Sequence, residues 1–162
     1  MEKDISMALD HWDKKYLSIA KEVSNWSKDV STQVGAVIAD AERRIVAVGF
    51  NGFPKKVPDS AERLSDRSKK YPRVVHAEAN VALIAGSAAS GGTVYVYGAP
   101  ICSHCAGILI QAGIARAIAK PPCEGSRAEP STSPVPRIDW DALGLIALEM
   151  FAEADIEFQP SE

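Results

Sequence analysis

The chain has 162 residues, of which 46% are hydrophobic and 24% charged, and these proportions are typical of one globular domain with its own core. Its net charge of −3 argues against a protein that binds nucleic acid through broad contacts with phosphates, because such proteins carry a basic surplus. The sequence lacks both an apolar run long enough to span a membrane and the apolar segment of a signal peptide. We therefore expect a single domain over residues 1–162, located in the cytoplasm, without a nucleic-acid or membrane partner.

The first half of the chain predicts a helix followed by a β-hairpin. Two β-branched runs at 34–40 and 45–50 flank a short polar turn and predict the hairpin. The loop 51–60 carries Asn-Gly and two prolines, and the polar, basic segment 61–73 is expected to continue it on the surface. In the helix, expected within 4–27, apolar residues recur at spacings of three and four and would form one buried stripe: Ile5, Leu9, Trp12, Tyr16, Ile19 and Val23.

The second half alternates helices and strands. A buried helix is predicted over 74–88, with Val75, Ala79 and Leu83 facing inward. Strands that alternate with helices after an opening hairpin predict an α/β sandwich around one sheet. The later elements are expected to be a strand at 93–98, a helix at 102–114 that Gly113 caps, a strand at 115–120, a proline-rich irregular segment at 121–138, a helix at 139–154 and an edge strand at 156–160.

Cys102 and Cys105 form a C-x-x-C pair at the start of a predicted helix. Two thiols at this spacing can hold a metal, form a redox pair or pack in a core, but in a cytoplasmic protein a structural disulfide is rare. The turn directs both sulfurs to one side, and the positive end of the helix favours their thiolates. The third cysteine, Cys123, has a proline before it and Glu124 after it and is expected to be a surface thiol.

A catalytic zinc site has three protein ligands and keeps a fourth position for water, so the two thiolates need one more partner. Of the three histidines, His11 lies in the solvated first helix, and the ring of His104 would point away from a metal held by its neighbours. His76 remains, in the sequence H-A-E-A-N. Glu78, two residues later, would lie close enough to a zinc-bound water to take its proton and pass it on. The expected site is therefore Zn²⁺ bound by His76 and the two thiolates, with Glu78 as the catalytic residue.

H-x-E together with P-C-x-x-C is the signature of zinc-dependent nucleobase deaminases. The chain resembles the cytidine/deoxycytidylate deaminase superfamily, and most closely its deoxycytidylate (dCMP) deaminase branch, over roughly residues 12–120. The resemblance implies a three-layer α/β/α sandwich around a mixed sheet of about five strands, a tightly bound zinc, and hydrolysis of dCMP to dUMP with release of ammonia by a homo-oligomer. The segments that carry it are S-K-D-V-S-T-Q-V-G-A-V-I (27–38), V-G-F-N-G-F-P (48–54), Y-P-R-V-V-H-A-E-A-N (71–80) and C-A-G-I-L-I-Q-A-G-I (105–114).

The resemblance also implies where the substrate binds. Asn51 would lie near the sugar, and the backbone around Ala77 and Pro100 would contact the edge of the base. One departure from the family pattern is Ile101, which separates the proline from the first cysteine and is expected to reshape the pocket wall. Another is the sequence P-P-C-E-G after the strand at 115–120, where the family places an aromatic residue.

Further residues are candidates for substrate contact on weaker grounds. Lys55, Lys56 and Arg73 would bind a substrate phosphate, although basic residues in a loop are more often simply solvated. Tyr95 and Tyr97 alternate with Val94 and Val96 in a predicted strand, so one pair faces the core and the other is open. Tyr97, the tyrosine nearest the C-x-x-C turn, is the candidate to face the substrate.

Three classes of function remain open from the sequence. The first is a deaminase of a cytosine nucleotide or nucleoside, and the second is a deaminase of another base, such as guanine or a modified base, or of RNA. The third is a non-enzymatic module that zinc stabilises. A structural zinc would fill its fourth position with protein, whereas this chain offers three ligands and an acid.

Overall fold

The computed structural model of the chain describes residues 8–125 and 134–162. Five strands form one mixed sheet in the order β2-β1-β3-β4-β5, in which β1 pairs antiparallel with β2 and β3 while β3, β4 and β5 run parallel. The predicted hairpin is β1 with β2, and the predicted edge strand is β5. The strands are β1 (Gly35–Ala39), β2 (Ile45–Phe50), β3 (Thr93–Tyr97), β4 (Arg116–Ala119) and β5 (Glu157–Pro160).

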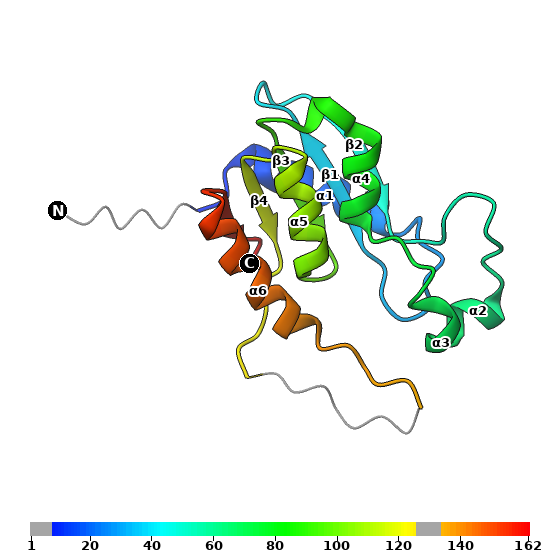
Figure 1. Cartoon of the computed structure of the whole chain (residues 1–162). Helices are drawn as coiled ribbons and strands as arrows, with labels where there is room; N and C mark the ends of the chain where they lie inside the picture. Colours follow the sequence, from blue (N-terminus) through cyan, green and yellow to red (C-terminus); the bar gives the residue numbers. More distant parts are fainter. Residues whose placement is uncertain (1–7, 126–133) are drawn as a thin grey trace.

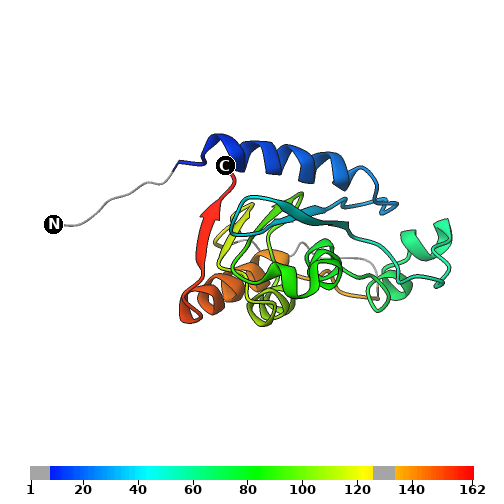
Figure 2. The ribbon, with the colours of Figure 1, turned by 90° about the horizontal axis from the view of Figure 1, so that it is seen from above.

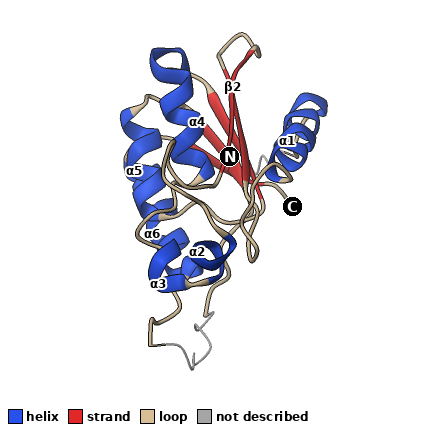
Figure 3. Cartoon of the chain, turned by 90° about the vertical axis from the view of Figure 1, so that its right-hand side faces the viewer, coloured by secondary structure: helices blue, strands red, loops and turns tan. Residues whose placement is uncertain are grey.

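Helices cover both faces of this sheet (Figures 1 and 2). Helix α1 (His11–Ser24) lies on one face, and α4 (Ala77–Ala85), α5 (Ser103–Gln111) and α6 (Trp140–Glu153) lie on the other (Figure 3). The predicted three-layer α/β/α sandwich around a mixed five-stranded sheet is therefore confirmed. Two short helices, α2 (Ala61–Ser65) and α3 (Arg67–Lys70), lie together at one side of the molecule (Figure 1), and the 3₁₀ turn η1 (Gly86–Ala89) follows α4. In the described part of the chain, no helix is long and apolar enough to cross a membrane.

Helix α1 packs on the sheet along much of the predicted stripe, with one correction. Tyr16 and Val23 are buried, whereas Trp12 is 47% exposed. The reason is that Asp13, its neighbour, turns inward and accepts hydrogen bonds from the guanidinium of Arg116 on β4. A buried carboxylate with a charged partner therefore occupies the place predicted for an aromatic ring. Ile5, which was also predicted to lie in the stripe, is outside the described residues.

Helix α4 is buried on one side only, which corrects the prediction for Leu83. Ala79 and Val81 are buried against the sheet, but Leu83 is 76% exposed and Ile84 is 64% exposed. Leu83 follows Val81 by two residues, or about 200° around the helix, so it faces away from the sheet. The buried stripe of α4 is thus narrower than expected from the number of apolar residues in this helix.

The loop regions were predicted with mixed success. Residues 121–125 and 134–138 form no helix or strand, as expected, and Gly113 follows α5 with a φ of +81°, as a C-terminal cap requires. The segment 61–73, however, is more than a surface loop. It folds into α2 and α3, and it ends by burying the side chain of Lys70, which is only 7% exposed.

Candidate functional site

Two helices on the same face of the sheet begin at the candidate metal ligands. His76 is the N-cap residue of α4 and Cys102 is the N-cap residue of α5, and neither side chain caps its own helix. Helix α4 can lie close to β2 because Gly49 has no side chain. A Cβ atom at this position would come within 2.8 Å of the backbone nitrogen of Val81. The fold therefore brings the two N-terminal ends together with both side chains free to bind.

His76, Cys102 and Cys105 form a cluster whose ligand atoms all lie within 4.8 Å of one another. His76 Nδ1 lies 3.5 Å from Cys102 Sγ and 3.4 Å from Cys105 Sγ. In a tetrahedral zinc site, with Zn–S near 2.3 Å and Zn–N near 2.0 Å, a sulfur and a nitrogen are about 3.5 Å apart. The donor atoms and their spacing therefore fit zinc.

The two thiols differ in their acidity. The hydrogen bond from the Cys105 thiol, together with His76, lowers the pKa of Cys102 to about 4 against the effect of burial. The same contact and burial raise the pKa of Cys105. The hydrogen bond with Cys102 also raises the pKa of His76, although burial opposes it. The site thus favours one thiolate by itself, and binding of a divalent cation would release the second proton.

Glu78 lies in the first turn of α4 and is only 3% exposed. Burial raises its pKa to about 7, although nearby His76 acts in the opposite direction. A carboxyl group with that pKa can both accept and donate a proton near neutral pH, as a general acid and base must.

A cavity of about 270 Å³ connects these groups to the rest of the site. His76, Glu78 and Cys102 line it, so the candidate metal cluster and the acid share one space. Trp140 at the start of α6 and Tyr71 also line it. The Trp140 ring stands edge-on to His76 at 5.3 Å between centroids and to Tyr71 at 6.3 Å. An aromatic wall is therefore present, but Trp140 of α6 and Tyr71 at the end of α3 supply it, rather than the residues directly after β4.

Three of the predicted substrate-binding residues, Asn51, Ala77 and Pro100, line this cavity. The side chain of Asn51 is already engaged, because its Oδ1 accepts from the Val34 N–H at 2.9 Å and its Nδ2 donates to the Thr32 carbonyl at 2.9 Å. Asn51 therefore fixes the loop that leads into β1 as well as bordering the cavity.

Four other predicted residues do not line the cavity: Lys55, Lys56, Arg73 and Tyr97. Lys55 and Lys56 are exposed on the turn before α2, and the guanidinium of Arg73 donates to the carbonyl of Lys69. Tyr97 extends to the other side of the sheet, where Lys21 of α1 lies 5.7 Å from its ring centroid. These four residues thus lie outside the cavity lining, away from the candidate metal ligands and Glu78.

Residues around the C-x-x-C turn are placed as follows. Ile101 is 3% exposed and packs in the core, while Pro100 lines the cavity, so the inserted residue extends the core rather than the wall. His104 is exposed and lies outside the candidate metal cluster, as expected. Cys123 is exposed, also as expected.

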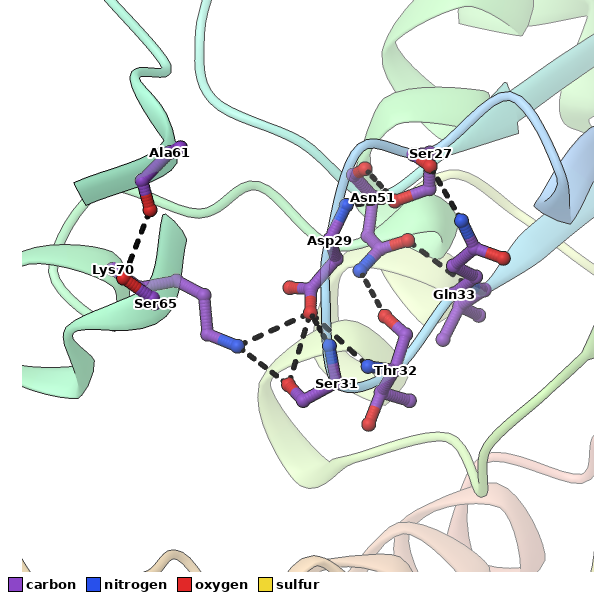
Figure 4. A network of polar contacts seen from close by, with 10 residues as sticks. Ser27, Asp29, Ser31, Thr32, Gln33, Asn51, Ala61, Ser65 and Lys70 are labelled. Atoms are coloured by element: carbon purple, nitrogen blue, oxygen red, sulfur yellow. Dashed lines mark hydrogen bonds and ion pairs between the residues drawn. The ribbon is translucent and has the colours of Figure 1, made fainter. Parts of the chain in front are cut away.

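A group of polar residues at the cavity was not predicted. Asp29, Ser31, Thr32 and Lys70, which we call the polar corner, line the cavity and are linked by hydrogen bonds (Figure 4). Lys70 Nζ lies 3.1 Å from Asp29 Oδ1 and 2.7 Å from Ser31 Oγ. An aspartate followed by Ser and Thr two and three residues later is a typical sequence for such a turn, but its pairing with Lys70 across 41 residues had no local signal.

Comparison with known proteins decides the family. The family model for the "Cytidine and deoxycytidylate deaminase zinc-binding region" matches residues 10–120. The chain belongs to the cytidine and deoxycytidylate deaminase family. The zinc-binding character of that matched region agrees with the cluster of one histidine and two cysteines, and the cofactor is Zn²⁺.

Relatives in this family match to different extents. An uncharacterized deaminase from the region 3′ of luxG in Aliivibrio fischeri is 36% identical over 149 residues, or 92% of each chain. The deoxycytidylate deaminase of Mus musculus is 39% identical over 115 residues, which cover 66% of this chain and 63% of the mouse protein. The chain thus matches less than two thirds of that enzyme's length.

Solved structures support the deaminase fold. A dCMP deaminase from cyanophage S-TIM5, in complex with dCMP and dUMP, superposes with a TM-score of 0.67 at 17% identity, over 94% of this chain and 99% of that one. RibD of Acinetobacter baumannii superposes with a TM-score of 0.60 at 19% identity, over 92% of this chain and 35% of RibD.

Proposed function

We propose that this deaminase hydrolyses the 4-amino group of a cytosine nucleotide, converting dCMP and water to dUMP and ammonia. The observation that carries the proposal is the meeting of His76, Cys102 and Cys105 with the buried Glu78 at one cavity. The similarity of the chain to proteins named deoxycytidylate deaminase supports dCMP as the substrate.

In this proposal, His76, Cys102 and Cys105 hold the zinc ion. When bound, zinc lowers the pKa of a water molecule to about 7 and so supplies a nucleophile at neutral pH. The cluster offers three ligands, which is the number found in catalytic sites that keep one position open. A purely structural zinc is less well supported, because the cluster contains no fourth ligand within the described residues.

Glu78 moves the protons of the reaction. Its carboxylate accepts a proton from the attacking water and delivers it to the ring nitrogen beside the amino group. A second transfer through the same carboxyl group protonates the amino nitrogen, which leaves as ammonia while the ring carbon keeps the new oxygen. The pKa of Glu78, about 7 because of burial, suits both transfers.

The other cavity residues would orient the base. The backbone at Ala77 and Pro100 borders the same space as Glu78 and can contact the polar edge of the ring, while Trp140 offers an aromatic surface beside it. Asn51 would help to position the sugar, both by lining the cavity and by holding the loop before β1 through its hydrogen bonds to Thr32 and Val34.

One observation favours a second candidate substrate, a cytosine nucleoside. Lys70 is the only lysine or arginine among the described residues that line the cavity, and its charge is balanced by Asp29. A phosphate would therefore find no unpaired cation there and would extend toward solvent. Deaminases of guanine or a modified base stay as alternatives, with no observation in their favour.

Ammonia release from a panel of purified compounds tests the proposal. Zinc-loaded protein is assayed with dCMP, deoxycytidine, cytidine, cytosine and guanine, and we expect the highest kcat/KM for dCMP. A higher value for deoxycytidine would select the nucleoside, and activity with guanine alone would reject a cytosine substrate. We also propose a cytoplasmic homo-oligomer; sedimentation of the same protein would reject the oligomer if only a mass near 17.3 kDa appears.

A further inference from the structure

The polar corner holds opposite charges in balance inside the cavity. Lys70 is 7% exposed and Asp29 is 9% exposed, and their charged groups are 3.1 Å apart. A buried pair of this kind is close to neutral as a unit. Adding a doubly charged phosphate beside it would place the phosphate next to the Asp29 carboxylate, which is unfavourable in a site of low dielectric.

Asp29 uses only one of its two carboxylate oxygens within the protein. Oδ1 accepts from the Ser31 N–H at 2.9 Å, the Ser31 hydroxyl at 3.0 Å, the Thr32 N–H at 3.0 Å and Lys70 Nζ at 3.1 Å. Among the described residues, no donor reaches Oδ2, which Figure 4 shows without a dashed line. Asp29 lines the cavity, so Oδ2 keeps accepting capacity that a ligand in the cavity can use.

Lys70 also keeps bonding capacity for a ligand. Its ammonium group carries three N–H donors, and two are directed to Asp29 and Ser31. The corner therefore presents one acceptor, Asp29 Oδ2, and one donor, Lys70 Nζ. A hydroxyl group both donates and accepts, so it matches this pair, whereas a phosphate only accepts.

We propose that the polar corner binds the sugar hydroxyl of the substrate, the 3′-hydroxyl of deoxyribose, which donates to Asp29 Oδ2 and accepts from Lys70 Nζ. The inference rests on the proposed function, because it takes the base to lie at the Glu78 end of the same cavity. Asn51 supports the corner by bonding to the backbone of Thr32 and Val34, on either side of Gln33. The 5′ end of the sugar then points out of the corner.

The test compares dCMP with 2′,3′-dideoxycytidine 5′-monophosphate, which lacks only the 3′-hydroxyl. With the unmodified protein we expect kcat/KM to be at least about tenfold higher for dCMP, because a hydrogen bond to a charged group is lost with the analogue. A ratio near one overturns the inference. This comparison needs no variant, so it decides even if changes at the corner prevent folding.

Variants then locate the effect. Asp29→Asn and Lys70→Met should each bring the ratio of dCMP to the dideoxy compound close to one. Asp13→Asn breaks another buried ion pair, with Arg116, away from the cavity lining, and it should keep the ratio of the unmodified protein. A purely structural role of Asp29 and Lys70 would lower activity with both compounds equally, and that result also overturns the inference.

Deoxycytidine distinguishes the hydroxyl from the phosphate. If Lys70→Met lowers kcat/KM for dCMP but not for deoxycytidine, while the ratio of dCMP to the dideoxy compound stays unchanged, the corner binds phosphate and the inference is wrong. If the unmodified protein deaminates none of these compounds, the proposed function fails and the inference fails with it. Equal rates with dCMP and its dideoxy analogue would overturn the inference alone.

Discussion

His76 Nδ1 lies 3.4 Å from the sulfur of Cys105, although 29 residues separate them in the chain. The contact exists because α4 and α5 begin side by side at one end of the sheet, with His76 and Cys102 as their N-cap residues. Helix N-termini stabilise negative charge, so the same arrangement that gathers the ligands also favours the thiolates.

Removing one ligand should remove the metal. We expect Cys102→Ser and His76→Ala to lose stoichiometric zinc, as measured by elemental analysis after gel filtration. The variants should also unfold at lower temperature than the zinc-loaded protein, because binding of the metal stabilises the folded state. His104→Ala changes an exposed residue outside the cluster and is the control. Full zinc content in both ligand variants would contradict the assigned metal site.

Trp140 is predicted to contribute to substrate binding. Trp140→Ala removes its part of the aromatic wall and should raise KM by about threefold to tenfold, the range expected for one aromatic contact. Steady-state kinetics with dCMP measure the change, and Trp12→Ala, at a tryptophan that is 47% exposed on α1, should leave KM unaltered. Equal KM values for Trp140→Ala and the unmodified protein, at unchanged zinc content, would show that Trp140 does not contact the substrate.

Stability should fall in acid because of Asp13. Burial by itself would raise the pKa of Asp13, but hydrogen bonds from Arg116, the Asp10 N–H and Tyr95 outweigh it and hold the pKa below its ordinary value. A carboxyl group with a lowered pKa in the folded state stabilises the protein above its unfolded pKa of about 3.9, and this contribution is lost as pH falls through the folded pKa. The urea concentration at the midpoint of unfolding should therefore decrease as the pH is lowered below about 4.

The same ion pair can be tested by substitution at neutral pH. Asp13→Asn removes the charge that pairs with the Arg116 guanidinium, although Glu157 still pairs with Arg116. It should lower the free energy of unfolding by roughly 1.5–3 kcal/mol at pH 7, the range for hydrogen bonds to a charged group. The difference from the unmodified protein should shrink in acid, because Asp13 then becomes protonated. Glu42→Gln, in an exposed pair with Arg44, should change stability little. A pH-independent effect of Asp13→Asn would contradict the role of its charge.

The metal ligands could be predicted from the sequence because each depends on a local pattern. Cys102 and Cys105 are one helical turn apart, and His76 was the remaining histidine with an acid beside it. The polar corner could not be predicted in this way, because Lys70 and Asp29 are 41 residues apart. Their pairing depends on how α3 folds back toward the loop before β1, and the basic segment around Lys70 gave no sign that one lysine is buried.

Two other errors have the same origin in tertiary packing. Leu83 has the composition of a core residue, but the position of Ala79 and Val81 on the sheet decides which side of α4 is buried. Trp140 reaches the cavity from α6, about twenty residues after β4, so no spacing rule connects it with the ligands. Local patterns predicted the elements and the chemistry, while contacts between distant segments decided the shape of the pocket.

Conversion of dCMP by the unmodified protein and by Glu78→Gln tests the central claim most directly. We expect the zinc-loaded protein to produce dUMP and ammonia in equal amounts, measured by chromatography and by an enzymatic ammonia assay. Glu78→Gln should keep its zinc and fold but lose at least about 10²-fold in kcat, because it cannot transfer protons. Undiminished turnover by Glu78→Gln, or no deamination of dCMP by the zinc-loaded protein, would contradict the account.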